Sequence, residues 1–410
     1  MKEILRLACV VLERTIEKRV QNTINKLCFD IKVYSYKSFD TLLANINKDH
    51  IDYIFVDIDS NRDNLMSFLE TLQKEFPHVI RVLVTDVLTD DLVLMTNMLV
   101  HVLLEKKPLE ETLKRLFLKA ERLRYLLKNQ DLIKMINSFN NLVVLKPQHL
   151  ELLQHINKHD SSTKEISKLM EKNIVLSTKV LQVANMAIFA TTEMIKTVSN
   201  AVIFLGLDII RALIINMQVF SFDSGKTNLF RHLALLERHC QNIAEYAKNI
   251  ARHFDASLVM QNNCFTAGLL HDIGKLVMMD KVYNWDSIQK LANVNGLIIW
   301  KAESAFLGTT HAHVGAYFLG IWNFPDDIID AVAFHHDPSS TENYTISCLT
   351  FVHIAEAMMK NNQVASLEEF EKQLDIDYLE KLGIKEQTID YYKAFLGMDN
   401  EPKKIEVVDS

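Results

Sequence analysis

The sequence predicts an α/β domain followed by an all-α region, and three observations support this fold class. Short apolar runs alternate with helical segments over about the first 125 residues. From about residue 140 the strand patterns fade and helical periodicity dominates. None of the ten glycines lies before Gly206. The first half therefore contains neither a GxGxxG nor a GxxxxGK[ST] motif, both of which need glycine for close backbone approach to phosphate.

Length and composition narrow the class of protein. A chain of 410 residues is too long for one ordinary domain. The formal net charge of −7 argues against nucleic acid as a partner, because nucleic-acid binding needs a basic face. The five cysteines are scattered without a CxxC pair, and no secretory leader or membrane-length apolar run is evident. We therefore expect a cytoplasmic protein that does not enter a membrane.

The first region reads as five β-α units. Strand-like runs at 4–11, 31–36, 52–58, 79–85 and 101–105 alternate with helical segments near 14–27, 39–48, 62–75, 89–98 and 109–128. Such alternation predicts a parallel sheet with helices on both faces, and ligands bind at the carboxyl ends of its strands. Those ends carry Asp57, Thr85 and Lys107.

Residues 1–125 resemble a response-regulator receiver domain, which implies a flavodoxin-like (βα)5 fold. The resemblance implies that Asp57 accepts a phosphoryl group, that Thr85 follows its oxygens and that Lys107 balances their charge. Receivers also hold Mg²⁺ with an acidic pair after the first strand, where this chain reads VVLER and offers only Glu13. Mg²⁺ binding and phosphorylation of Asp57 therefore stay open, and a receiver-shaped module for protein contacts is the alternative.

A long helical pattern follows Pro108 and joins the two regions. Its apolar stripe is formed by Leu109, Leu113, Leu116, Leu123 and Leu127. We assign 126–140 to a helical linker. The apolar stripe could also pair with its copy in a second chain, so a homodimer stays an open alternative.

Residues 141–360 carry the pattern of a compact helical bundle, and 361–410 add charged helices and a polar tail. A capping box from Ser162 to Glu165 predicts a helix start. The phrases LQVANMAIF, TVSNAVIFLGLDIIRAL, AGLLHDIGKLVM, ESAFLGTTHAHVGAYFL, WNFP and AFHH follow one another in order. Together they resemble the HDOD family, a helical relative of HD-type metal phosphohydrolases. We expect Trp322 to pack in a corner and Asn185 to be a buried amide bonded to backbone.

The resemblance to HD phosphohydrolases implies a site for a divalent metal such as Mn²⁺, Fe²⁺ or Zn²⁺, which would activate water against a phosphoester. Lys275 lies one helical turn beyond His271 and could steady a phosphate. The hydrolase alternative places catalysis on His271, Asp272 and Lys275. The implied ligands are His239, His271, Asp272, His311 and His335 or His336.

Two differences from HD hydrolases argue against catalysis. The place of their last aspartate is taken by Glu356, with His353 nearby, and HHDPSSTENY contains no GYP signature. Three interpretations of His271 and Asp272 stay open: a metal-free relic of the fold, a metal-binding but non-catalytic site, and a working phosphohydrolase.

The predicted function is that of a response-regulator-like signalling protein. Its HDOD output domain would bind a downstream protein or a ligand without catalysis, and a histidine kinase or another signalling protein would act upstream. The alternative is a metal-dependent phosphohydrolase or cyclic-nucleotide phosphodiesterase.

Overall fold

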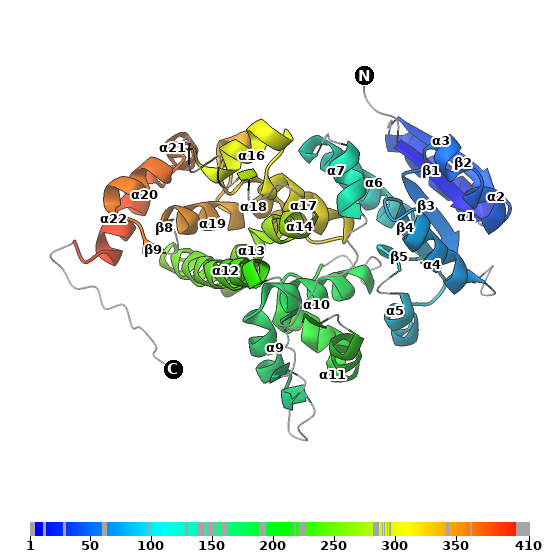
Figure 1. Cartoon of the computed structure of the whole chain (residues 1–410), viewed down its shortest axis with the longest axis horizontal. Helices are drawn as coiled ribbons and strands as arrows, with labels where there is room; N and C mark the ends of the chain where they lie inside the picture. Colours follow the sequence, from blue (N-terminus) through cyan, green and yellow to red (C-terminus); the bar gives the residue numbers. More distant parts are fainter. Residues whose placement is uncertain are drawn as a thin grey trace.

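The fold is described from a computed structural model of the chain (Figure 1). It describes residues 5–398 except 11–13, 28–29, 60–63, 97–98, 108, 128–129, 138–143, 146–150, 153, 157–161, 188–193, 217–218, 221–226, 282–286, 289, 291, 293, 295–296, 342–343 and 361–362. Glu13, the candidate Mg²⁺ ligand, therefore lies outside the described residues.

The first domain is a five-stranded parallel sheet with strand order β2-β1-β3-β4-β5. This is the flavodoxin-like order that the sequence predicts. Strands β3 and β4 are buried along their whole length, as expected for a parallel sheet that is covered on both faces. The strands are β1 (Leu5–Val10), β2 (Ile31–Tyr36), β3 (Tyr53–Asp57), β4 (Ile80–Thr85) and β5 (Val102–Glu105). Its helices are α1 (Arg14–Leu27), α2 (Phe39–Leu43), α3 (Ile46–Asp49), α4 (Leu65–Glu75), α5 (Asp90–Thr96) and α6 (Leu109–Leu126).

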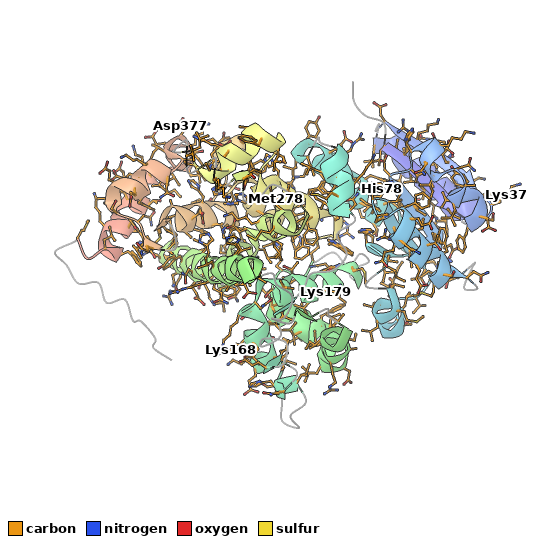
Figure 2. The ribbon with its side chains drawn as sticks, viewed as in Figure 1. Lys37, His78, Lys168, Lys179, Met278 and Asp377 are labelled. Carbon is orange, nitrogen blue, oxygen red and sulfur yellow. The ribbon has the colours of Figure 1, made fainter. Side chains whose placement is uncertain are left out.

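In the described residues after the sheet domain the structure is mainly helical, with two short β pairs, β6–β7 and β8–β9, that the sequence did not indicate. The predicted capping box forms, because Ser162 Oγ accepts from Glu165 N and the Glu165 carboxylate accepts from Ser162 N. Figure 2 shows Met278 among the inner helices, whereas Lys168 and Asp377 lie at the periphery. The helices are α7 (Gln130–Asn137), α9 (Thr163–Glu171), α10 (Ile174–Ala187), α11 (Val198–Asn216), α12 (Thr227–His253), α13 (Leu258–Leu270), α14 (Ile273–Lys281), α16 (Ile299–Leu307), α17 (His311–Ile321), α18 (Asp326–Phe334), η1 (Pro338–Ser340), α19 (Cys348–Ala357), α20 (Leu367–Gln373), α21 (Ile376–Leu382) and α22 (Lys385–Phe395). The β pairs join β6 (Val144–Leu145) to β7 (Val219–Phe220) and β8 (Met359–Lys360) to β9 (Gln363–Val364).

Helix α6 attaches the two parts of the molecule to each other rather than serving as a free linker. It packs on α1 of the sheet domain and on α17 of the helical region. Its Lys119 ammonium is buried and donates to Asn323 Oδ1 at 3.2 Å and to the Phe324 carbonyl at 2.6 Å. Nearby, Arg122 forms ion pairs with Asp326, the first residue of α18, and with Asp330, one turn further along that helix. These contacts fix the sheet domain against the ends of α17 and α18.

The structural roles predicted for Trp322 and Asn185 are confirmed. Trp322 is buried at this junction and its ring lies 4.7 Å from that of His101, so it is a packing residue. Asn185 is buried, donates to the Ile195 carbonyl and accepts from Ile195 N. Among the described residues, no helix has the length and apolar character that crossing a membrane would require.

Candidate metal centre

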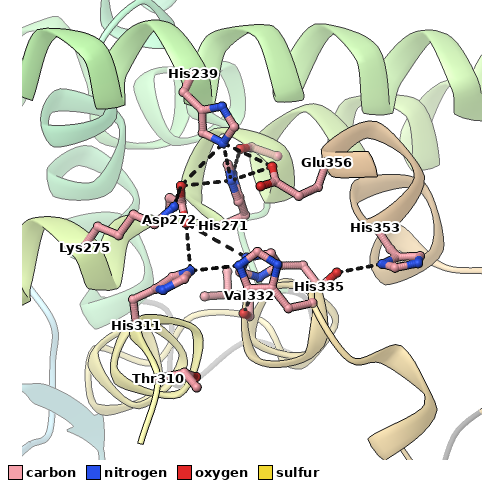
Figure 3. A network of polar contacts seen from close by, with 12 residues as sticks. His239, His271, Asp272, Lys275, Thr310, His311, Val332, His335, His353 and Glu356 are labelled. Carbon is pink, nitrogen blue, oxygen red and sulfur yellow. Dashed lines mark hydrogen bonds and ion pairs between the residues drawn. The ribbon is translucent and has the colours of Figure 1, made fainter. Parts of the chain in front are cut away.

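Side chains with metal-ligating atoms converge at one place inside the helical region (Figure 3). They stand mostly at helix ends: His271 caps the C-terminus of α13, His311 is the first residue of α17, and His335 caps α18. Two further helices complete the site, with His239 on α12 and Glu356 on α19. The site therefore depends on how these helices pack rather than on one local motif.

The first ligand set consists of His239, His271 and Glu356, whose ligand atoms lie within 4.8 Å of one another. His239 Nε2 is 3.2 Å from His271 Nε2 and 3.1 Å from Glu356 Oε2. Asp272 Oδ2 adjoins this set, 3.5 Å from His239 Nε2 and 3.3 Å from His271 Nε2. Metal–ligand bonds of about 2.1 Å place neighbouring ligand atoms roughly 3.0–3.4 Å apart. The observed spacing is thus suited to one ion.

The second ligand set consists of Asp272, His311, His335 and His336, also within 4.8 Å of one another. His311 Nε2 lies 3.1 Å from Asp272 Oδ1 and 3.1 Å from His336 Nε2. His335 Nε2 lies 3.9 Å from the same Asp272 oxygen. Asp272 therefore presents one oxygen to each ligand set, as a carboxylate shared by two metal ions would.

Three imidazoles are held with Nε2 directed into the site, because their Nδ1 atoms bond elsewhere. His271 Nδ1 lies 2.6 Å from the Gly268 carbonyl, and His335 Nδ1 lies 2.8 Å from the Val332 carbonyl. A carbonyl can only accept, so each Nδ1 carries the proton. Both carbonyls belong to the last turn of their helix, where the C=O groups have no N–H partner within the helix. His311 Nδ1 is held instead by Glu303 Oε2 at 2.7 Å. Anchoring the far ring nitrogen in this way is typical of metal-bound histidine.

The carboxylates of the site are ionised despite their burial. Burial by itself raises the pKa of Asp272, but His271 and Lys275 lower it well below its ordinary value. The pKa of Glu356 is likewise raised by burial, yet His239 lowers it well below the usual range. Lys275 Nζ donates to Asp272 Oδ2 at 2.6 Å.

The imidazoles fall into two classes. Burial lowers the pKa of His335 and of His336 well below the ordinary value, so both rings are neutral and carry a free lone pair. For His271 burial also lowers the pKa, but Asp272 and Cys240 raise it well above the ordinary value. His271 without metal therefore favours the doubly protonated ring. A metal ion bound at Nε2 would replace the proton on that nitrogen, because only the neutral ring binds metal.

Two further observations test whether these residues fit a divalent ion. Asp272 Oδ1, His335 Nε2 and Glu356 Oε2 are buried and have no hydrogen-bond partner of acceptable geometry among the described residues. Buried polar atoms are nearly always satisfied, so atoms without a partner indicate a missing one. When the imidazoles are neutral, the carboxylates of Asp272, Glu303 and Glu356 together with the Lys275 ammonium carry two net negative charges, which favours the binding of cations. The residues present fit a metal.

Comparison with protein families identifies the domain that holds this site. A family model described as the HDOD domain matches residues 142–338. Residues 142–338 form an HDOD domain. The match spans every residue of the two ligand sets except Glu356, which lies beyond its end. The family resemblance of the sequence phrases is thereby confirmed.

Known relatives of the chain are distant. A curated protein from Treponema pallidum (strain Nichols), described as uncharacterized, is 24% identical over 215 residues, which are 50% of this chain and 40% of that protein. A solved virulence factor from Campylobacter jejuni subsp. jejuni is 17% identical and covers 68% of this chain and 99% of its own, with a TM-score of 0.51. The MmoQ response regulator from Methylococcus capsulatus str. Bath is 19% identical and covers 62% of this chain and 98% of its own, with a TM-score of 0.44.

All the ligands that the sequence suggested lie in the HDOD-domain site, and the structure adds others. Glu356 completes the first ligand set, although the sequence indicated only that it replaces an expected aspartate. Cys240, which the sequence did not single out, is buried within 4.8 Å of ligand atoms of His271 and Asp272. His353 is not a ligand, because its Nδ1 donates to the His335 carbonyl and its Nε2 accepts from Asp375 N, at the N-cap of α21.

The carboxyl ends of the sheet strands form a second polar cluster, and it corrects one assignment. Asp57 is buried, and its Oδ1 lies 3.1 Å from Nζ of Lys106 rather than Lys107, which is exposed. The Lys106 ammonium also lies 3.1 Å from carboxylate oxygens of Asp59 and Asp86. The assignment differs by one residue because β5 ends at Glu105 and successive side chains there point to opposite sides.

Thr85 ends β4, beside Asp57 in the sheet. It is buried, and its hydroxyl donates to the Val87 carbonyl at 3.2 Å. Burial raises the pKa of Asp59, but the Asp86 backbone and Lys106 lower it, so Asp59 is ionised. The Lys106 ammonium is thus the common counter-ion of this cluster.

Proposed function

We propose that this chain is a signalling protein whose HDOD domain holds divalent metal and binds a phosphate-bearing ligand there. The observation that carries the proposal is the pair of ligand sets sharing Asp272, with three buried ligand atoms that form no hydrogen bond among the described residues. Bound metal would supply positive charge that attracts and polarises phosphate oxygens. Lys275, 2.6 Å from Asp272 and partly accessible, adds a cation at the same place. A site with a purely structural role would not require so many buried metal-ligating atoms.

Metal analysis tests the proposal directly. Purified protein, reconstituted with Mn²⁺, Fe²⁺ or Zn²⁺ and passed over a weak chelator, should retain metal at a fixed stoichiometry. His271→Ala and Asp272→Ala should lose it, and His253→Ala, an exposed histidine on α12, should not. Wild-type protein that retains no ion under any of these conditions would refute the proposed function.

Phosphoester hydrolysis is the second candidate, favoured by Asp272 facing both ligand sets. Two adjacent ions activate the attacking water and stabilise the leaving oxygen in two-metal hydrolases. Metal-loaded protein should then cleave a generic substrate such as bis-p-nitrophenyl phosphate, and Asp272→Asn should abolish the reaction. If the protein binds stoichiometric metal but does not turn over phosphodiesters, phosphomonoesters or cyclic nucleotides, hydrolysis is excluded. The proposed ligand-binding function would then still stand.

Coupling to the sheet domain supports the signalling part of the proposal. Helix α17 has His311 at its first residue, and the loop after its last residue contains Asn323, which meets Lys119. Helix α18 begins at Asp326, beside Lys119, and leads into His335. The two helices that contact α6 at one end therefore carry ligands of the second ligand set at the other.

We further propose that the sheet domain receives the signal at Asp57, from a kinase or through another protein. Lys106 beside Asp57 and Thr85 at the end of the next strand support phosphoryl acceptance. Incubation with acetyl phosphate and Mg²⁺ should add one phosphoryl mass to wild type and none to Asp57→Ala. No mass change in either protein would leave a receiver-shaped module that signals by protein contact.

A further inference from the structure

Glu303 on α16 occupies an unusual position beside the second ligand set. Its side chain is fully buried, and one oxygen, Oε2, meets two donors of the same residue: His311 N at 2.7 Å and His311 Nδ1 at 2.7 Å. The backbone N–H can only donate, so Oε2 is an acceptor, and the ring proton therefore lies on Nδ1. The lone pair of His311 Nε2 is left facing Asp272 Oδ1 and His336 Nε2.

The place of His311 in its helix explains why it needs this partner. His271 and His335 stand at helix C-termini and anchor Nδ1 on a carbonyl three residues back in their own helix. His311 is the first residue of α17, so no helical turn precedes it and no such carbonyl exists. The Glu303 carboxylate supplies the missing acceptor and also meets one of the free N–H groups at the positive end of the helix.

Stability does not account for a carboxylate at this position. Taking an ionised carboxylate out of water costs several kcal/mol, and an apolar side chain would avoid that cost. The second oxygen, Oε1, is also buried and has no hydrogen-bond partner among the described residues. A cation bound at Nε2, on the opposite side of the imidazole, would balance the charge through the ring.

We propose that Glu303 is a positioning residue that holds His311 as the Nδ1–H tautomer and thereby sets the metal affinity of the second ligand set. This inference rests on metal binding by the HDOD domain. It assigns Glu303 to one of the two ligand sets, because Glu303 contacts His311 and no member of the first ligand set in the described structure. Loss of Glu303 should therefore weaken the binding of one ion and leave the other in place.

Glu303→Ala and Glu303→Gln test the assignment, with Glu371→Gln on the exposed face of α20 as the matched control. Outer carboxylates typically contribute 10- to 100-fold to metal affinity. We expect that loss for one ion in Glu303→Ala, a smaller loss in Glu303→Gln because its amide oxygen still accepts from Nδ1–H, and none in the control. Chelator competition with Zn²⁺ measures the affinities, and thermal unfolding of metal-free protein shows that each variant is folded. If Glu303→Ala does not fold, the isosteric Glu303→Gln decides.

Tautomer measurement separates positioning from a purely structural role. In protein labelled with ¹⁵N-histidine, His311 should show protonated Nδ1 in the wild type and a shift towards protonated Nε2 in Glu303→Ala. Folded variants with wild-type affinity and an unchanged His311 tautomer would overturn the assignment while the metal site stands. Wild-type protein that binds no Zn²⁺ would overturn both.

Discussion

Adding one methyl group at Gly274 should disrupt the second ligand set without replacing any of its ligands. Gly274 lies on α14, two residues after Asp272, where α14 crosses the start of α17. A Cβ built there would stand 2.7 Å from Gly315 N and 2.8 Å from the carbonyl carbon of His311, and closer still to the oxygen of that carbonyl. All of these atoms are backbone, so no side chain can turn away.

The size of the effect follows from those distances. Ordinary van der Waals contact begins near 3.4 Å, so the 2.7 Å distance to Gly315 N alone is about 0.7 Å too short, and α14 and α17 must separate by more than that. Functional geometry tolerates about 0.5 Å, and the separation would draw His311 away from Asp272. Overpacking typically costs 1–3 kcal/mol, against a gain of about 1 kcal/mol for alanine over glycine in a helix. We expect Gly274→Ala to be destabilised by up to about 2 kcal/mol and to lose metal from the second ligand set.

Metal content after chelation, together with urea unfolding of the metal-free protein, measures both effects. Gly320→Ala is the matched control on α17. Its Cβ would meet Leu123 side-chain atoms, one of them at 2.6 Å, and those can move. Gly320→Ala should keep full metal content. A Gly274→Ala protein with wild-type stability and stoichiometric metal would refute the argument that this backbone contact sets the ligand geometry.

Three further changes test other parts of the structure. Lys106→Met should lower the free energy of unfolding by about 3 kcal/mol, because the buried Asp57 carboxylate loses its counter-ion. The exposed substitution Lys107→Met should change it by no more than about 0.5 kcal/mol in the same urea titration. Burial lowers the pKa of Lys119 to about 8, so between pH 8 and about 10.4 the unfolded chain keeps a proton that the native protein has lost. Over that range the free energy of unfolding of the wild type should therefore rise more steeply than that of Lys119→Met, by up to about 1.4 kcal/mol per pH unit. Parallel curves of unfolding free energy against pH would contradict this. Glu356→Gln should weaken the binding of the ion held by the first ligand set, as measured by chelator competition, and unchanged affinity would remove Glu356 from that set.

The sheet domain could be predicted from the sequence because its signals are local. Apolar runs of strand length and helical segments alternate five times, and a parallel sheet built from such units buries nearly all of each strand. The order of the strands matches the flavodoxin-like fold that the receiver resemblance implies. The short pairs β6–β7 and β8–β9 were missed, since two-residue strands leave no periodicity to detect.

Candidate ligands could be named from the sequence, but their geometry could not be predicted from it. His271, Asp272, His311, His335 and His336 lie in phrases that resemble the HDOD family, whereas His239 lies outside the quoted phrases. Which atoms face each other depends on the packing of α12, α13, α17, α18 and α19, whose residues are far apart in sequence. Glu356 gave a weak signal as the carboxylate nearest to an expected aspartate, and Cys240 gave none.

Glu303 and Lys106 show where sequence reasoning reaches its limit. Glu303 opens ESAFLG eight residues before His311, but only the turn between α16 and α17 brings its carboxylate onto the ring. Two adjacent lysines follow β5, and a shift of one residue in the strand end decides which one enters the Asp57 cluster. In both cases the residue type was visible and the direction of the side chain was not. Because direction decides whether a charge is a counter-ion, an anchor or a solvated surface group, the roles of these two residues had to come from the folded structure.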